Sequence, residues 1–325
     1  MRYLLFILLI SSIIACSGTK SMVGKKSMKR DMDEIIEVQV VSDSISLYGT
    51  LTLPKSDRKA VPLAIIIAGS GPTDRDCNNP MGKSNTYKMI AEELMINGIA
   101  TLRYDKRMVG KSIDVKLKEE DTRFDEMVTD ALSWIRKYEN DKRFSSITIL
   151  GHSEGSLVGM LAAQQSEVSR FASLAGPARS ADIILLEQIG KQMPFAVPNL
   201  KKQFAKLKAG ELIEEVDPSL LSILRPSVQK YMISWFQYTP TEELKKLDIP
   251  VLIMQGTTDI QVEVKEAELL HASSTSSKLQ LFVNSNHIFK DAPEDRNGNL
   301  KTYSDPDLPL SENVVETIVE FINGG

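Results

Sequence analysis

The sequence predicts an α/β fold, in which helices flank a mostly parallel central sheet and a helical insertion interrupts the series. Two observations predict this fold class. Between residues 62 and 175, short apolar runs alternate with longer amphipathic segments, as in strands joined by helical crossovers. The alternation stops at residue 176 and resumes at residue 250.

The first expected strands are residues 35–41 and 45–53, an antiparallel pair that Pro54 and a charged turn close. The later strands are apolar runs of the kind that parallel sheets bury on both faces. These runs cover residues 62–68, 99–104, 146–150, 170–175, 250–255 and 278–283.

Helices are expected between these strands. Over residues 121–138, for example, Phe124, Met127 and Val128 begin an apolar stripe with helical spacing. The other core helices are predicted at residues 84–97, 154–165, 262–272 and 311–323. Residues 176–245 contain helical patterns at 199–214 and 226–238 without a convincing strand. We expect this insertion to form a lid between two parts of the core, 35–175 and 246–325, with plain helical packing as the alternative.

Composition places the chain among ordinary globular proteins. Of its 325 residues, 42% are hydrophobic and 25% charged. The formal net charge of −4 gives no basic face for a nucleic acid, so we expect no nucleic-acid partner.

The first 34 residues differ from the rest. An apolar stretch runs from Tyr3 to Ala15, too short to span a bilayer comfortably and typical of an export signal. Its end, Ile13-Ile14-Ala15-Cys16, resembles the lipobox of bacterial lipoproteins, in which the cysteine takes a lipid. We therefore expect a signal peptide over 1–16, a flexible tether over 17–34, and a bacterial envelope protein anchored to the membrane through Cys16. An ordinary signal peptide is the alternative.

The pentapeptide Gly151-His152-Ser153-Glu154-Gly155 follows the predicted strand 146–150 and precedes a predicted helix. A G-x-S-x-G sequence in this context forms a sharp turn that exposes the serine and needs small flanking residues. The start of the helix also favours developing negative charge near the serine oxygen. The pattern predicts Ser153 as a nucleophile, with a mere tight turn as the alternative.

A serine hydroxyl needs a base, and the chain has only three histidines. His287 follows the strand 278–283, at a carboxyl end where loops of a parallel sheet gather. His152 lies inside the turn, and its side chain is expected to point away from the attacking face. His271 lies late in a helix and is expected at the surface. His287 is therefore the predicted base.

The base needs an acidic partner that fixes its tautomer. Asp259 follows the strand 250–255, and the chain order serine, aspartate, histidine is that of the α/β-hydrolases. The alternative is that Asp259 only caps the helix near residue 262.

An acyl-transfer site also needs amides that bind an oxyanion. One is expected to be the N–H of Glu154, directly after the serine. The other is expected from the loop Gly69-Ser70-Gly71 after the strand 62–68, with Ser70 first and Gly71 next. A phosphate cradle is the alternative, but neither usual glycine spacing for one follows.

These segments resemble bacterial α/β-hydrolases of the serine aminopeptidase-like superfamily, near the lipolytic carboxylesterases. The likeness runs from about residue 36 to the end, and its motifs are Ala68–Asn78, Arg103–Ser112, the pentapeptide, Leu224–Trp235, Gln255–Val262 and Asn286–Lys290. Cys77 and Met108 replace glycines of the family pattern, in loops that we expect to border the pocket.

The resemblance implies an α/β-hydrolase fold and esterase activity on short or medium acyl esters, small-molecule substrates that need neither a metal nor an organic cofactor. Gly69, Gly71, Gly151 and Gly155 are expected to shape the site. A structural charge network is expected from Asp74, Arg75, Asp76, Arg103 and Asp105.

Other functions remain open at this point. A peptidase or an acyltransferase could use the same three residues. A solute-binding lipoprotein would instead have two similar α/β lobes and no intact triad. An inactive hydrolase could serve as a docking surface.

Overall fold

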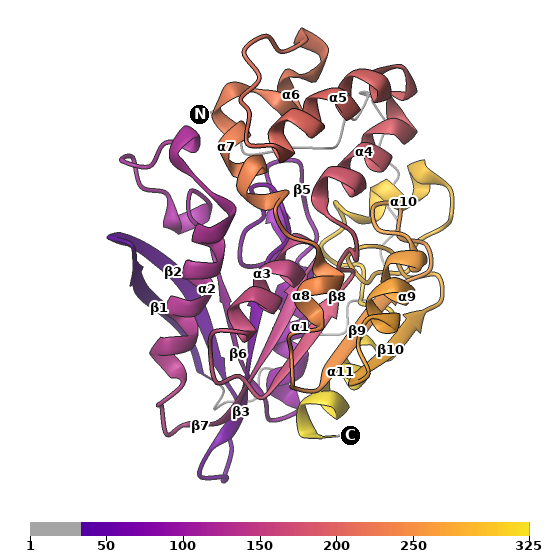
Figure 1. The fold of residues 1–325 in the computed structure, drawn as a ribbon. Coiled ribbons are helices and arrows are strands. Elements are labelled where there is room, and N and C mark those ends of the chain that lie inside the picture. The colour runs from indigo at the N-terminus through magenta and orange to yellow at the C-terminus, as the bar shows by residue number, and fades with distance from the viewer. Residues whose placement is uncertain (1–33, 325) are drawn as a thin grey trace.

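A computed structural model describes residues 34–324, and its centre is one eight-stranded sheet (Figure 1). The strand order is β1-β2-β6-β3-β7-β8-β9-β10. The strands are β1 (Glu34–Ser42), β2 (Ile45–Leu53), β3 (Val61–Ile67), β6 (Ala100–Tyr104), β7 (Phe144–His152), β8 (Arg170–Leu174), β9 (Val251–Gly256) and β10 (Ser277–Phe282). Strand β2 pairs antiparallel with β1 and β6, and the remaining pairs are parallel. The predicted fold class is confirmed.

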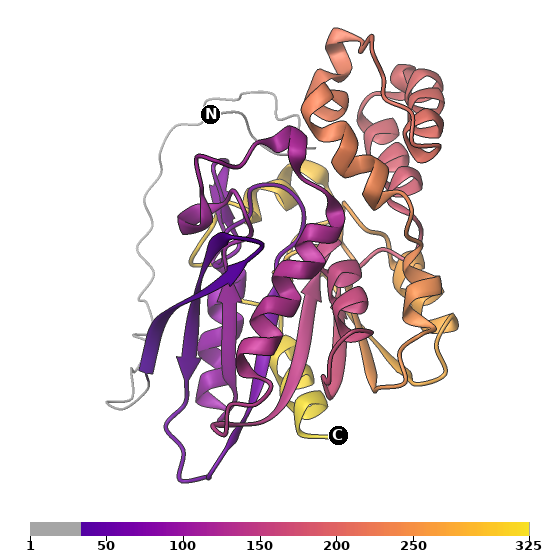
Figure 2. The same cartoon turned by 60° about the vertical axis from the view of Figure 1, so that its left-hand side comes forward.

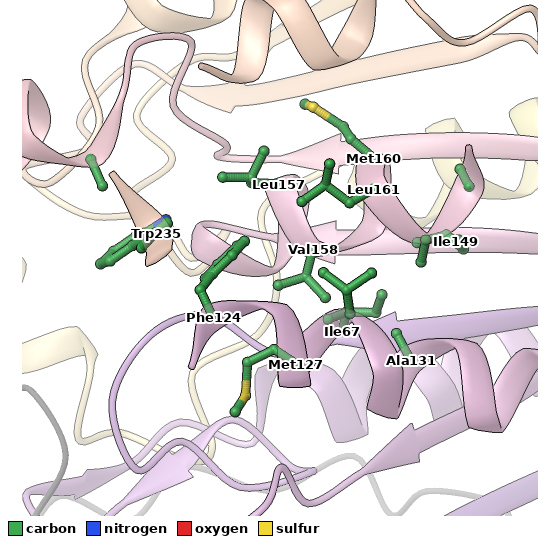
Figure 3. Packing of buried hydrophobic residues seen from close by; sticks show 14 of the residues in the cluster. Ile67, Phe124, Met127, Ala131, Ile149, Leu157, Val158, Met160, Leu161 and Trp235 are labelled. Atoms are coloured by element: carbon green, nitrogen blue, oxygen red, sulfur yellow. The ribbon is translucent and has the colours of Figure 1, made fainter. Parts of the chain in front are cut away.

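Helices cover both faces of the sheet, because the buried strands are apolar on both sides. Side chains of β3 alternate between two cores: Leu63 and Ile65 face one, and Ala64 and Ile66 face the other. Helices α2 (Phe124–Tyr138), α3 (Glu154–Ala163) and α9 (Val264–Ala272) close the first core, and Figure 3 shows part of its packing. Helices α1 (Thr86–Ile96) and α11 (Val314–Asn323) close the second.

Between β8 and β9 the chain is helical. The helices are α4 (Ala181–Gln192), α5 (Val197–Lys208), α6 (Leu221–Leu224), α7 (Pro226–Trp235) and α8 (Pro240–Leu244). Helices α4 to α7 gather beyond one end of the sheet (Figures 1 and 2). The ring of Trp235 in α7 stacks on Phe124 of α2 with centroids 5.9 Å apart, which fixes this group of helices to the core.

Some elements differ from the prediction. The helix expected over 199–214 is α5, which ends at Lys208 because Gly210 takes a φ of +85°. Helix α10 (Arg296–Thr302) and the short hairpin of β4 (Asn78–Asn79) and β5 (Gly82–Lys83) were not expected. The segment of α10 is polar and has no apolar period, so no helix signal marks it.

Within residues 34–324, no helix has both the length and the apolar character needed to cross a bilayer. The predicted signal peptide, most of the tether and Cys16 lie outside the described residues.

Candidate active site

Ser153 lies in a strained turn between β7 and α3. Its backbone has φ 54° and ψ −121°, a conformation that L-residues rarely adopt. A Cβ atom on Gly151 would lie 2.4 Å from the carbonyl oxygen of Gly155, and one on Gly155 would lie 2.4 Å from that of Ile67. The turn therefore requires glycine at both positions, as the sequence pattern predicts.

The structure brings the loops of Ser153, Asp259 and His287 together. Strands β7, β9 and β10 run parallel, so the loops that follow them meet at one edge of the sheet. The Nδ1 atom of His287 lies 2.7 Å from Oδ2 of Asp259, and both side chains are buried. Ser153 and His287 line one cavity of about 140 Å³.

The Asp259 carboxylate is held by several donors. Oδ1 accepts from the amides of Gln261 at 2.7 Å and Val262 at 2.9 Å, and Oδ2 accepts from Nε2 of Gln255 at 2.9 Å. A carboxylate only accepts, so Nδ1 of His287 carries the proton and Nε2 is left with its lone pair. Asp259 therefore orders its own loop and also orients His287.

His152 cannot serve as the base, because both of its ring nitrogens are engaged. Nε2 lies 2.8 Å from the carbonyl of His287 and must donate, so Nδ1 accepts from the Tyr87 hydroxyl at 2.8 Å. Burial, followed by the neighbouring His287, lowers the pKa of His152 to about 3. His152 is among the residues that line the cavity, with both ring nitrogens bonded to other protein groups.

His271 plays no part in this cluster. It lies exposed in α9, where Nδ1 is 2.9 Å from Oγ of Ser277. This is the surface position expected from the sequence.

The two amides predicted for an oxyanion hole face no protein acceptor. Within the described part of the chain, neither the N–H of Ser70 nor that of Glu154 makes a hydrogen bond. Gly69 lies against the serine, since a Cβ on it would be 3.1 Å from Cβ of Ser153. Gly71 lines the same cavity with a φ of +73°.

The charged residues of the family motifs pair with one another. The guanidinium of Arg75 lies 2.7 Å from Asp105, and that of Arg103 lies 2.9 Å from Asp76. Asp74 accepts backbone N–H groups of its own loop, and burial raises its pKa. None of these five residues lines the cavity, as a structural network requires.

Cys77 and Met108 both occupy positions that favour glycine, with φ values of 70° and 64°. Cys77 is buried in the cavity wall, and burial raises the pKa of its thiol to about 11. Met108 does not itself line the cavity, but Lys106 of the same loop bonds Gly69 and Gly71, which do.

The walls of the cavity were not predicted residue by residue. Most of its apolar residues come from the helical segment between β8 and β9 and from the loops after β9 and β10, with Pro177, Ala181, Ile184, Leu185, Trp235, Val262 and Ile288. Of the described residues that line the cavity, only Glu154 has a carboxyl side chain. Its Oε1 accepts from the Tyr231 hydroxyl at 3.0 Å, and burial raises its pKa.

Comparison with known families agrees with this geometry. The family model described as "Serine aminopeptidase, S33" matches residues 81–289, which is more than half of the chain. The chain belongs to this α/β-hydrolase family. The family that the sequence motifs resemble is thereby confirmed.

Relatives of this S33 family member include esterases. Esterase EstD of Thermotoga maritima is 26% identical over 245 residues, which cover 74% of this chain and 58% of the relative. The chain thus spans 58% of the length of that curated relative.

Solved structures share the fold. Est1E from Butyrivibrio proteoclasticus, with ferulic acid bound, is 20% identical with a TM-score of 0.58, over 88% of this chain and 96% of its own. Proline iminopeptidase from Mycobacterium smegmatis is 13% identical with a TM-score of 0.56, over 89% and 97%. Among the described residues, no group of histidine, cysteine, aspartate or glutamate side chains is arranged to hold a metal.

Proposed function

We propose that the chain is a serine carboxylesterase that hydrolyses short- to medium-chain acyl esters through an acyl-enzyme. The observation that carries this proposal is the buried His287–Asp259 pair, 2.7 Å apart, whose histidine lines the same cavity as Ser153 in its strained turn. The pairing leaves Nε2 of His287 as an acceptor in the cavity that Ser153 lines.

In the proposed reaction, Ser153 Oγ attacks the ester carbonyl while Nε2 of His287 takes the hydroxyl proton. The amides of Ser70 and Glu154 bind the resulting oxyanion. The tetrahedral intermediate collapses, and the alcohol leaves with the proton from His287. Water then attacks the acyl-enzyme, again losing a proton to His287. The acid departs as Ser153 recovers its proton.

The cavity supports an ester over the substrate of an aminopeptidase. An aminopeptidase has to hold a protonated α-amino group, which calls for an available carboxylate. The only carboxyl side chain among the described lining residues is that of Glu154, and the buried Tyr231 hydroxyl already binds it. The relative from Thermotoga maritima, Esterase EstD, points the same way.

The proposal is tested with p-nitrophenyl esters from acetate to dodecanoate beside aminoacyl-p-nitroanilides. We expect turnover of acetate to octanoate esters and at least about 100-fold lower kcat/KM for every anilide, since no described residue of the cavity offers an unengaged carboxylate to the amine. A preference for an anilide would favour the peptidase, and ester-dependent transfer to added alcohols in place of hydrolysis would favour the acyltransferase.

The same panel tests the acyl wall. Ala181 is buried in α4 and lines the cavity, so Ala181→Phe fills that space. We expect kcat/KM for octanoate to fall about 10-fold or more while acetate changes less than about threefold. Ile183→Phe is the matched control, because Ile183 is 39% exposed on the same helix and does not line the cavity. Equal losses on both esters would contradict this acyl site.

We also propose that the protein is exported and held in the bacterial envelope through a lipid on Cys16. The apolar stretch that ends at Ala15-Cys16 supports this. Palmitate incorporation in cells that disappears in Cys16→Ser would support the anchor, and incorporation that persists would refute it.

A further inference from the structure

We propose that Lys106 is a positioning residue for the oxyanion hole, which orients the Gly69–Ser70 peptide so that the N–H of Ser70 faces the reacting carbonyl. This inference rests on the proposed acyl transfer at Ser153. It assigns a task to a buried lysine that the mechanism above does not use.

Lys106 reaches the Gly69–Gly71 loop from the loop that follows the neighbouring strand β6. Strands β3 and β6 are parallel neighbours, so the loops that follow them lie side by side. The Lys106 side chain is only 6% exposed, and its Nζ donates to the carbonyl oxygens of Gly69 and, at 2.9 Å, Gly71. One ammonium thus holds two carbonyls of the three-residue segment.

The geometry of a trans peptide turns this contact into an orientation of the amide. The C=O of Gly69 and the N–H of Ser70 belong to one planar unit and point in opposite directions. The described residues contain no cis peptide bond. Because the Gly69 carbonyl points at Lys106, the Ser70 N–H points the other way and remains without a protein acceptor.

Other contacts restrict which amide of the loop is available. The N–H of Gly69 donates to the Tyr87 hydroxyl at 3.2 Å. The carbonyl of Ser70 accepts from the Thr73 hydroxyl at 3.1 Å, and Pro72 has no N–H to offer. Gly69 also lies against Cβ of Ser153. Gly69 and Pro72 therefore offer no amide, and the N–H of Ser70, the residue after Gly69, has its direction fixed by the Lys106 contact.

The charge of Lys106 is arranged for this task. Burial lowers its pKa, and the negative charge of Glu154 opposes that shift. A buried ammonium is expensive unless its protons are bonded. The flexible lysine stem places several donors on two diverging carbonyls, which methionine of similar length cannot do.

The test measures oxyanion binding itself, by comparing a p-nitrophenyl ester with its thionoester. Sulfur accepts hydrogen bonds poorly, so a working oxyanion hole favours the oxygen ester. For Lys106→Met we expect kcat for the oxygen ester to fall about 10- to 100-fold with KM changed less than about threefold. The ratio of kcat/KM for the oxygen ester to that for the thionoester should fall about 10-fold. The thionoester depends less on the oxyanion hole, because its sulfur accepts hydrogen bonds poorly.

Lys290→Met is the matched control. Lys290 is fully buried, and its Nζ donates to two backbone carbonyls, those of Ser84 and Asp305, each at 2.6 Å. Its loss should lower stability in the same way yet leave the oxygen-to-sulfur ratio within about twofold of wild type. The ratio does not depend on the folded fraction, so it stays informative for a destabilised variant. Lys106→Gln, which keeps an uncharged NH₂ as a donor, should give an intermediate ratio and serves if the methionine variant yields no folded protein.

The outcomes separate the two proposals. Wild-type protein that hydrolyses no ester refutes the proposed function. Wild-type protein with a strong oxygen preference that Lys106→Met and Lys106→Gln both retain refutes the role of Lys106 alone. An equal fall of the ratio in Lys290→Met would also overturn that role.

Discussion

Replacing Ser153 by alanine is expected to lower kcat for the preferred ester by about 10⁵- to 10⁶-fold, because no acyl-enzyme can form. The turn should survive, since the glycines at 151 and 155 set its shape and the Ser153 amide keeps its bond to the carbonyl of Leu174 at 2.9 Å. Residual hydrolysis would come from direct attack by water on the bound ester, with the oxyanion amides still stabilising the transition state. The effect is measured from initial rates, normalised to a protein concentration that is determined without active-site titration.

Ser166→Ala provides a matched control for this substitution. The Ser166 hydroxyl donates to the carbonyl of Ala162 at 2.8 Å, after the end of α3 and away from the cavity. Its loss should change kcat less than about twofold. A Ser153→Ala variant with more than a tenth of wild-type activity would remove this residue from the chemistry.

Asp259→Asn is expected to lower kcat about 10⁴-fold, an effect of the size known for a triad aspartate changed to asparagine. The Asp259 carboxylate accepts from two amides, Gln255 and His287, so every group around it is a donor. An asparagine has to turn its NH₂ toward one of them. If the NH₂ faces His287, Nδ1 becomes the acceptor and the ring proton moves to Nε2. Nε2 can then no longer take the proton of the Ser153 hydroxyl.

The control for this second substitution is Asp248→Asn, an exposed carboxylate in the segment before β9. It should keep wild-type kinetics, because it contacts neither His287 nor the cavity. Thermal unfolding of both variants separates loss of stability from loss of orientation. A folded Asp259→Asn variant that loses less than about 10-fold in kcat would show that Asp259 only orders its loop.

The alternation of short apolar runs with amphipathic segments is what makes this fold predictable. The expected strand 45–53 coincides with β2, and the other core strands lie within two residues of their predicted bounds. The inner strands β3, β6, β8 and β9 are buried on both faces, so their sequences carry a strong signal. The segment of α10 is the opposite case, because tertiary contacts such as Asn299 donating to the carbonyl of Thr258 at 2.8 Å hold it in place.

Some residues of the site could likewise be predicted from the sequence, and others could not. Ser153, Asp259 and His287 could be proposed because each follows a recognisable strand, and parallel strands end at one edge. The roles of Lys106, of Tyr87 and of the apolar residues that line the cavity could not be predicted. Lys106 bonds backbone carbonyls 35 and 37 positions away, and a contact with a carbonyl places no demand on residue type there. A lysine in a charged segment is ordinarily expected at the surface.

The most direct test of the central claim is to find the covalent adduct. Wild-type protein treated with a fluorophosphonate should gain one adduct by intact mass, and peptide mapping should place it on Ser153. His287→Ala should slow labelling by several orders of magnitude, since the hydroxyl loses its base. An adduct on a different residue, or labelling that persists in Ser153→Ala, would contradict the account.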